Sequence, residues 1–219
     1  MNEVIGLAAS GKIGSSPVDL LVALFLLGLV PLLAVSVTSF ARIVVVLGLV
    51  RASIGAPSLP PNIVLAALAM MLTCVIMGPT FGRIRQDALA PYAAHRLSPA
   101  QAVARGAAPL RDFMLRQTRP ADVAAFARMA HERVSRPADA PLTVVAPAFL
   151  VGELRAAFAM GFALALPFAV VDIVVASVLM SLGMFMVSPS SIALPIKLLL
   201  FVAADGWSLL CGALVASYR

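Results

Sequence analysis

The chain has 219 residues, of which 62% are hydrophobic and 12% are charged, and its formal net charge is +6. This hydrophobic share exceeds the about 45–50% of ordinary globular domains and is typical of a membrane protein or of a subunit of a very apolar assembly. The basic residues are scattered and almost all arginine, without the basic runs of a nucleic-acid surface, so the composition argues against nucleic-acid binding.

Residues 1–19 form an N-terminal segment whose charged residues are Glu3, Lys12 and Asp19. This segment lacks the basic start of a secretory signal, so we expect no cleaved signal peptide. The apolar block that follows, residues 20–50, is longer than the about 20 residues needed to cross a bilayer. Pro31, the pair Thr38 and Ser39, and Arg42 interrupt it, which predicts two helical pieces.

A second apolar block completes a first helical hairpin over residues 20–81. Gly55 is suited to ending the preceding helix, because glycine readily adopts the left-handed conformation of a helix C-cap. The chain restarts at residues 60–62. We expect a helix over residues 63–77 that Gly78 and Pro79 terminate.

Residues 82–141 differ sharply in composition, with ten arginines against five acidic residues. Apolar residues recur at helical spacing in residues 110–117 and 123–134, which predicts two amphipathic helices separated near residues 118–120. The positive-inside rule weakens for loops near about 60 residues, so the charge of this polar segment does not decide which side of a membrane it faces.

Residues 142–219 read as a second apolar hairpin. We expect helices over residues 142–166 and 168–182, separated by Pro167, and a return helix over residues 192–218. The fold class predicted from the whole chain is therefore all-α and membrane-class, with two long apolar helical hairpins joined by a polar, amphipathic-helix segment.

Isolated charges lie inside the apolar blocks, where a charge at a bilayer centre costs at least about 2.5–3.5 kcal/mol. Such groups need partners on other helices or subunits. Glu153 and Arg155 are two residues apart, so on a helix they do not face each other and each needs a partner elsewhere. The charges that we expect at contacts between helices or between subunits are Arg42, Glu153, Arg155, Asp172, Lys197 and Asp205.

Catalytic chemistry finds little support in the sequence. Asp172 and Asp205 could in principle share a proton as in an intramembrane aspartyl protease, but their neighbours do not match the motifs of those enzymes. The two cysteines and two histidines lack metal-ligand spacing. We therefore expect no enzyme, no metal and no cofactor, and keep a small-solute transporter and the protease as remote alternatives.

The break at residues 183–189 combines Gly183 and Pro189, which release the backbone from a helix, with Met184 and Met186, whose side chains adapt to irregular surfaces. Two interpretations follow from the residues alone. The methionines either fill space in a hairpin turn or, repeated around an axis, form a hydrophobic constriction of a pore.

Several segments resemble the FliP/SctR family of type III secretion export-gate subunits (YscR/HrcR-like in the injectisome branch). The resemblance extends in order from about Leu20 to the C-terminal end of the sequence. The segments that carry it include residues 38–43, 51–55, 60–62, 113–119, 147–149, 153–154, 183–184, 194–201 and 205–207, together with Asp172.

The resemblance implies a subunit of a bacterial inner-membrane export gate, within the basal body of the secretion system, through which unfolded polypeptides pass. It implies a homo-oligomer, a pentamer in the family, arranged as a ring or helical complex with FliQ/SctS-like and FliR/SctT-like partners, held largely above the membrane plane. The polar segment, residues 82–141, would be periplasmic.

The family's methionine-rich pore gasket corresponds to Met184, Phe185 and Met186, with Gly183 and Pro189 as loop hinges. Phe185 stands where methionine is more usual, which keeps the seal apolar but makes it stiffer. The expected absence of a cleaved signal peptide, the compact polar segment and residues 187–189 resemble the injectisome branch, associated with virulence, more than the flagellar one. The flagellar FliP paralogue is the alternative.

Overall fold

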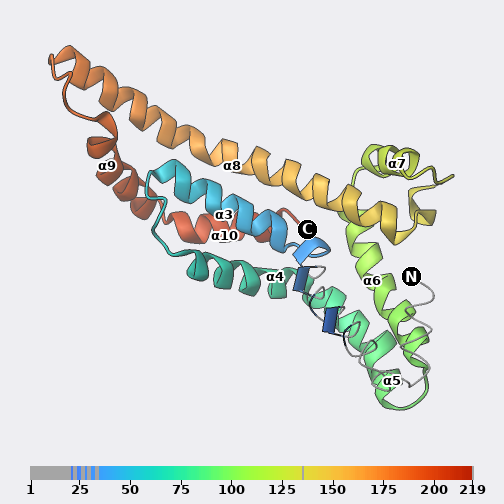
Figure 1. Cartoon of the computed structure of the whole chain (residues 1–219). Coiled ribbons are helices and arrows are strands. Elements are labelled where there is room, and N and C mark those ends of the chain that lie inside the picture. The colour runs from blue at the N-terminus through green and yellow to red at the C-terminus, as the bar shows by residue number, and fades with distance from the viewer. Residues whose placement is uncertain are drawn as a thin grey trace. The chain divides into compact units, whose positions relative to one another are not determined.

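The computed structural model describes residues 35–134 and 136–218, together with Leu21, Leu24, Phe25, Gly28, Pro31 and Leu32. Within these residues every regular element is a helix, which confirms the all-α class (Figure 1). The chain divides into two compact units, one of Met1–Ser39 and Met77–Gly152 and the other of Phe40–Ile76 and Glu153–Arg219. The N-terminal segment, residues 1–19, lies outside the described residues, so the expectation that it is not a cleaved signal peptide stays a prediction.

The first long described helix is α3 (Phe40–Ile54). It follows a turn at Val37–Ser39, which confirms the interruption predicted at Thr38 and Ser39. Arg42, also expected to interrupt the block, instead lies inside α3. Gly55 has φ +91, so the helix ends as predicted, in a backbone conformation that side-chain-bearing residues rarely adopt.

The next helix, α4 (Asn62–Ile84), begins where the sequence predicted a restart. The prediction that Gly78 and Pro79 end it is wrong, because α4 continues through Pro79. A π-helical segment, Arg85–Leu89, and the short α5 (Ala90–Ala93) follow it directly. Proline removes one backbone hydrogen bond, and apolar helices tolerate that loss where neighbouring groups and local π adjustments satisfy the freed backbone.

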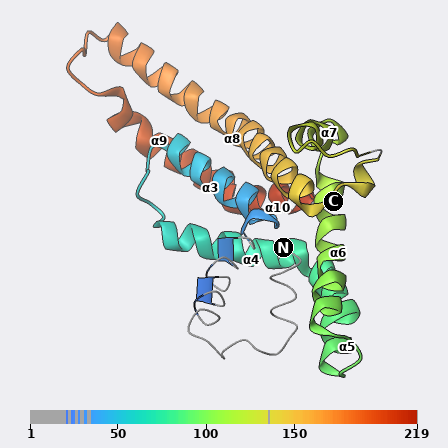
Figure 2. The same cartoon turned by 45° about the vertical axis from the view of Figure 1, so that its right-hand side comes forward.

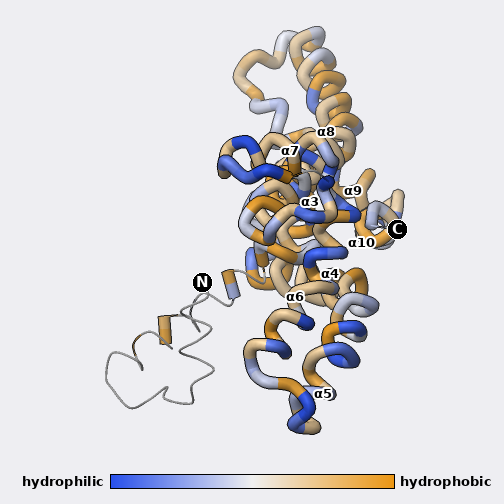
Figure 3. The backbone as a smooth tube through the Cα atoms, turned by 90° about the vertical axis from the view of Figure 1, so that its right-hand side faces the viewer, coloured by the Kyte–Doolittle hydropathy of each residue, from blue (hydrophilic) through white to orange (hydrophobic). Residues whose placement is uncertain are grey.

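The polar segment forms the two predicted amphipathic helices, α6 (Pro99–Gln117) and α7 (Pro120–Met129). A capping box starts α6: Gln101 N donates to Ser98 Oγ, and Ser98 N donates to Gln101 Oε1. Thr118 and Arg119 separate the helices at the predicted position. Hydrophilic and hydrophobic residues alternate along this part of the tube in Figure 3.

The longest helix is α8 (Leu142–Ser181). It runs without interruption through Pro167, so the predicted separation there is wrong, for the same physical reason as at Pro79. Its C-terminal end is the predicted break: Gly183 has φ +72, its N–H donates to Met180 O, and Met184 N–H donates to Leu179 O. These two bonds form a Schellman motif that fixes where the helix stops.

The return limb is not the single helix that we expected over residues 192–218. It forms α9 (Pro189–Ala203) and α10 (Gly206–Ala216), bent by 64°. Asp205, with φ 48, occupies the bend. Phe201 and Trp207 meet edge to face across it with ring centroids 5.2 Å apart, and a Cβ at Gly206 would lie 2.7 Å from Phe201 Cζ. Close aromatic packing therefore fixes this bend. The hydrophobic pattern along residues 192–218 does not predict it.

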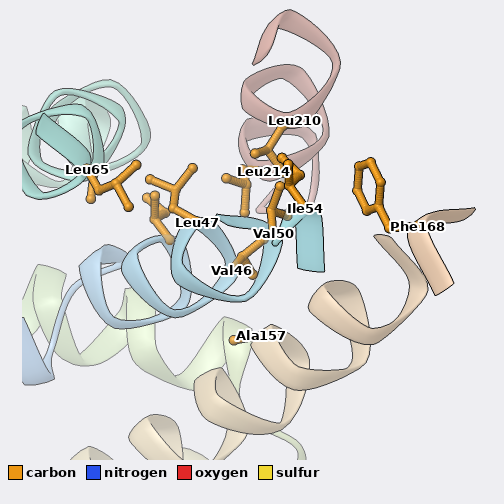
Figure 4. Close-up of a cluster of buried hydrophobic side chains, with 11 residues drawn as sticks. Val46, Leu47, Val50, Ile54, Leu65, Ala157, Phe168, Leu210 and Leu214 are labelled. Atoms are coloured by element: carbon orange, nitrogen blue, oxygen red, sulfur yellow. The ribbon is translucent and has the colours of Figure 1, made fainter. Parts of the chain in front are cut away.

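The core of the second unit is an apolar cluster around α3, and both views show α3 running beside α8 and α10 (Figures 1 and 2). In Figure 4, Leu65 of α4 points toward Leu47, while Leu210 and Leu214 of α10 lie near Val50. Burying each such side chain contributes about 1.5–3 kcal/mol. The cluster therefore joins both apolar hairpins, which are far apart in sequence.

Two helical stretches in the described part of the chain, Asn62–Ala93 and Leu142–Ser181, are long and apolar enough to cross a membrane. The bent pair α9 and α10 makes a third candidate if both helices belong to one span. These stretches agree with the membrane class expected from composition.

Candidate functional site

An ion pair lies buried in the second unit, between α3 and α8. Arg42 Nη2 donates to Glu153 Oε1, and both side chains are buried. Arg42 Nη1 also donates to Ser217 Oγ over 3.1 Å. A desolvated charge needs nearly all its hydrogen bonds satisfied, so this pair requires polar groups around it. Ser217 supplies one of them, whereas Arg42 Nε is buried without a hydrogen-bond partner among the described residues.

Tyr218 completes this group. Its hydroxyl donates to Glu153 Oε2, and its ring lies 4.0 Å from Arg42 Cζ in a cation–π contact. Burial, and then the negative charge of Glu153, raise the pKa of the Tyr218 phenol above its ordinary value. We call Arg42, Glu153 and Tyr218 the polar triad.

Tyr218 and Ser217 are not among the residues predicted to pair, because that prediction rests on formal charge alone. A hydroxyl-bearing aromatic residue at the end of an apolar block was an available signal, since buried tyrosine hydroxyls usually have a partner.

A second buried charge joins three helices. Lys197 Nζ on α9 donates to Asp172 Oδ2 on α8 over 2.6 Å and to the Ser53 carbonyl of α3 over 3.2 Å. The Lys197 side chain is 7% exposed, whereas that of Asp172 is 48% exposed. The lysine bridge, as we call these three residues, therefore buries the cation and leaves the carboxylate accessible.

The remaining two predicted charges lie elsewhere. Arg155 is exposed on α8, two residues beyond Glu153, as the helical spacing required. Asp205 is exposed at the bend between α9 and α10. Within the described residues the structure does not bring Asp205 into a hydrogen bond with Asp172.

The predicted pore loop lies between α8 and α9. Met184, Phe185 and Met186 are 42%, 81% and 99% exposed, so they do not fill a core in this chain. Gly183 ends α8 in the left-handed conformation, and Pro189 is the first residue of α9. Both hinge residues lie at the helix ends where the sequence placed them, and we refer to Met184–Met186 as the methionine turn.

The described residues offer no cluster of metal ligands. The described residues contain no group of three or more histidine, cysteine or acidic side chains close enough to hold a metal ion. Cys74 and Cys211 are both free thiols.

Long apolar helices, charges paired between helices and an exposed apolar turn define an all-helical, membrane-class subunit. The model of the FliP family matches residues 23–214 of this sequence. The chain therefore belongs to the FliP family.

Its relatives include the flagellar biosynthetic protein FliP of Pectobacterium carotovorum, 45% identical over 95% of this chain and 81% of the relative. The protein of the same name from Bacillus subtilis is 43% identical over the full length of both. A third, from Buchnera aphidicola subsp. Baizongia pistaciae, is 44% identical over 95% of this chain, which spans only 58% of that relative. All three carry a flagellar name, so the expected injectisome branch is not supported and the flagellar alternative fits better.

Proposed function

We propose that the chain is a subunit of the flagellar type III export gate. Together with copies of itself, five in the family, and with FliQ-like and FliR-like partners, it lines the entry portal for unfolded polypeptides. The complex belongs to the inner membrane, within the flagellar basal body. The observation that carries this proposal is the FliP family match over residues 23–214, supported by relatives named as flagellar biosynthetic proteins.

The methionine turn is, in this proposal, the seal of the closed gate. In the single chain these three consecutive apolar side chains are exposed to water and contribute little hydrophobic stabilisation. If several copies meet around an axis, the side chains would bury one another and exclude ions. Methionine supplies adaptable side chains, and Phe185 supplies a bulkier, stiffer one. The Schellman motif at Gly183 supports this role because it anchors the turn to α8.

The exposed apolar faces of the long helices support assembly with partner subunits. Ile173, Val174 and Val178 on α8 are each more than half exposed in the single chain. Patches of this kind mark contact with lipid or with another protein. The half-exposed Asp172 carboxylate gives such a partner a polar contact within an otherwise apolar surface.

We propose no enzymatic activity. Asp172 accepts a hydrogen bond from Lys197, and the described residues do not pair it with Asp205, as the two aspartates of an aspartyl protease would be paired. A protease would lose peptide cleavage when Asp172 or Asp205 becomes asparagine. A small-solute transporter would bind its ligand as a purified single subunit.

The decisive experiment combines assembly with permeability. The full chain is expressed with the FliQ-like and FliR-like proteins of its own genome, and the purified complex is placed in lipid vesicles. We expect a stable complex that is closed to ions, and a leak when Met184, Phe185 and Met186 are all replaced by alanine. Met129→Ala, at an exposed methionine on α7, is the matched control and should remain closed.

A chain that forms no complex with these partners would contradict the export-gate proposal. An alanine variant as tight as wild type would contradict the seal. Deleting the gene tests the branch: loss of flagella and motility supports the flagellar gate, whereas intact flagella with loss of another secreted set of proteins contradicts it.

A further inference from the structure

We propose that the unit containing Met77–Gly152 binds an anionic phospholipid. One acyl chain lies in an apolar groove beside α6, and the phosphate lies at Arg85 and Arg105. We call this recess the α6 groove. The inference takes from the export-gate proposal only the location in a membrane, and it does not depend on the seal formed by the methionine turn.

The α6 groove has the size of a ligand site. It lies between α6 and the stretch formed by the π-helical segment and α5, which run side by side (Figures 1 and 2). Its volume is about 580 Å³, within the range of about 300–1,000 Å³ of small-molecule sites. The two sides meet at Gly106, where a Cβ would lie 3.6 Å from Ala88 Cβ and 3.9 Å from Ile84 Cγ2. This contact forms the floor of the groove, because Ala88 is buried.

The lining of the groove favours a hydrocarbon ligand. Leu89 and Val103 line it and are each more than half exposed. Among the lining residues only Tyr92 has a polar side-chain atom, its phenol oxygen. A polar ligand buried there would lose hydrogen bonds to water without replacement, whereas an acyl chain has none to lose. An acyl chain would also remove the exposed apolar side chains from water.

The π-helical segment is a second, independent sign of a binding site. Such segments are rare and occur mostly at functional sites. In this chain Ala88 and Leu89 belong to the segment Arg85–Leu89, and both line the groove. The irregular backbone therefore lies at the recess itself.

The length of α4 places the groove at the edge of a bilayer. α4 has 23 residues. At about 1.5 Å per residue it spans about 35 Å, slightly more than the about 30 Å of a hydrocarbon core. The first charged residues after Asn62 are Arg83 and Arg85, and Tyr92 follows them. Arginine side chains extend toward the headgroups and tyrosine is enriched beside them, so the groove, which begins at Ile84, lies at headgroup depth.

Exposed arginines next to the groove supply the contact with a phosphate. Arg85 follows Ile84 and Arg105 precedes Gly106, and these two lining residues approach each other across the floor. Both arginines are exposed. Guanidinium groups bind phosphate oxygens through pairs of hydrogen bonds, so a phosphate at this level would give both side chains a counter-ion.

The surrounding charge favours an anionic headgroup over a zwitterionic one. Residues 83–106 hold four arginines and one acidic residue. Arg83 pairs with Asp112 over 3.3 Å. Arg85 and Arg105, in contrast, form no ion pair within the described residues. Basic side chains at a membrane surface attract anionic lipids.

Lipid retention by the complete complex tests the inference. The complex with its FliQ-like and FliR-like partners is placed in vesicles of equal phosphatidylglycerol and phosphatidylcholine, extracted in mild detergent and weighed by native mass spectrometry. We expect phosphatidylglycerol to remain bound in preference to phosphatidylcholine by roughly thirtyfold, because each arginine near the headgroup contributes roughly fivefold. The full chain alone, in the same vesicles, carries the same test if the partners do not bind.

Charge variants separate the phosphate contact from general attraction by a basic surface. Arg85→Gln with Arg105→Gln should abolish the preference for phosphatidylglycerol. The matched control is Arg116→Gln with Arg128→Gln, which removes two exposed arginines that do not adjoin the groove and should keep the preference. Equal losses in both double variants would show only non-specific attraction and would overturn the inference.

A groove-filling variant tests the site of the acyl chain. Ala107→Phe places a ring in the groove and should abolish lipid retention, whereas Ala104→Phe, on the same helix but outside the lining, should keep it. A photoreactive side chain at Val103, in the otherwise unchanged chain, gives an independent readout. Under illumination it should attach to phospholipid, and attachment to another chain would show that protein covers the groove.

A complex that retains no phosphatidylglycerol, or retains both lipids equally, would overturn the lipid site and leave the export gate intact. An adduct of the photoreactive side chain with protein would do the same. Failure of the chain to assemble with its partners would contradict the export gate alone, and the lipid result on the full chain would still decide this inference.

Discussion

Tyr218 donates its hydroxyl to Glu153 Oε2, while the other oxygen of this carboxylate accepts from Arg42. The carboxylate therefore has both oxygens engaged inside a largely apolar unit. Glu153 on α8 and Arg42 on α3 belong to different hairpins, so this contact ties the two hairpins together as well as neutralising the charge.

Tyr218→Phe keeps the ring over Arg42 and removes only the hydroxyl. We expect it to lower the free energy of unfolding by about 1–3 kcal/mol, because one oxygen of a buried carboxylate loses its donor. Thermal unfolding of the full chain in detergent measures the change. Tyr92→Phe, on the exposed side of α5, is the control, and an equal effect of both substitutions would contradict the polar triad.

The raised pKa of Tyr218 predicts a dependence of stability on alkaline pH. The fold favours the neutral phenol, so its contribution is complete below pH 10.0, the ordinary tyrosine value, and is lost as the pH rises above it. The expected slope is about 1.4 kcal/mol per pH unit for this single group. The free energy of unfolding of wild type and of Tyr218→Phe, measured at several pH values above 10.0, isolates this contribution. If the two free energies fall with pH in parallel, Tyr218 is not responsible for the loss.

Replacing one partner of the buried ion pair should lower the free energy of unfolding more than replacing both partners. Arg42→Met or Glu153→Leu alone leaves one charge buried, so each should destabilise the fold by about 3–5 kcal/mol. The double variant Arg42→Met with Glu153→Leu should recover a large part of this loss, because no charge remains. A double-mutant cycle by chemical unfolding measures the coupling, and additive losses would show that the pair is unimportant.

Because Lys197 is buried and Asp172 is half exposed, substitutions of the two residues should destabilise the fold by different amounts. Asp172→Asn leaves a buried lysine without its counter-ion and should cost about 1–3 kcal/mol. Lys197→Met leaves a half-exposed carboxylate that water can solvate, so the cost should be about 0–1 kcal/mol. Both should impair assembly before they change which substrates pass. Gel filtration of the complex and a secretion assay check this order, and normal oligomers with altered substrate choice would contradict it.

Close packing of α3 on α8 depends on Gly161. A Cβ there would lie 2.9 Å from Leu49 Cβ, so Gly161→Ala should overpack the contact and destabilise the second unit by about 1–3 kcal/mol. Gly152→Ala in the same helix meets no atom within 4 Å and should be neutral or slightly stabilising. Unfolding of the two variants side by side checks the difference, and equal stability would mean that the helices separate without cost.

The sequence by itself determined the features that depend on neighbouring residues along the chain. The ends of α3 at Gly55 and of α8 at Gly183, the start of α4 after Pro61 and the break between α6 and α7 all follow from local backbone preferences. The positions of the apolar blocks were equally predictable, because they follow from the run of hydrophobic residues along the chain.

Only the tertiary structure decided which charges meet. Arg42 and Glu153 are separated by 111 positions, and Tyr218 reaches the same carboxylate from the far end of the chain. Packing also decided that α4 and α8 continue through Pro79 and Pro167, and that an αL residue, Asp205, divides the return limb. The physical reason is the same in each case: the free energy comes from contacts between helices, and a pattern read along one helix does not contain them.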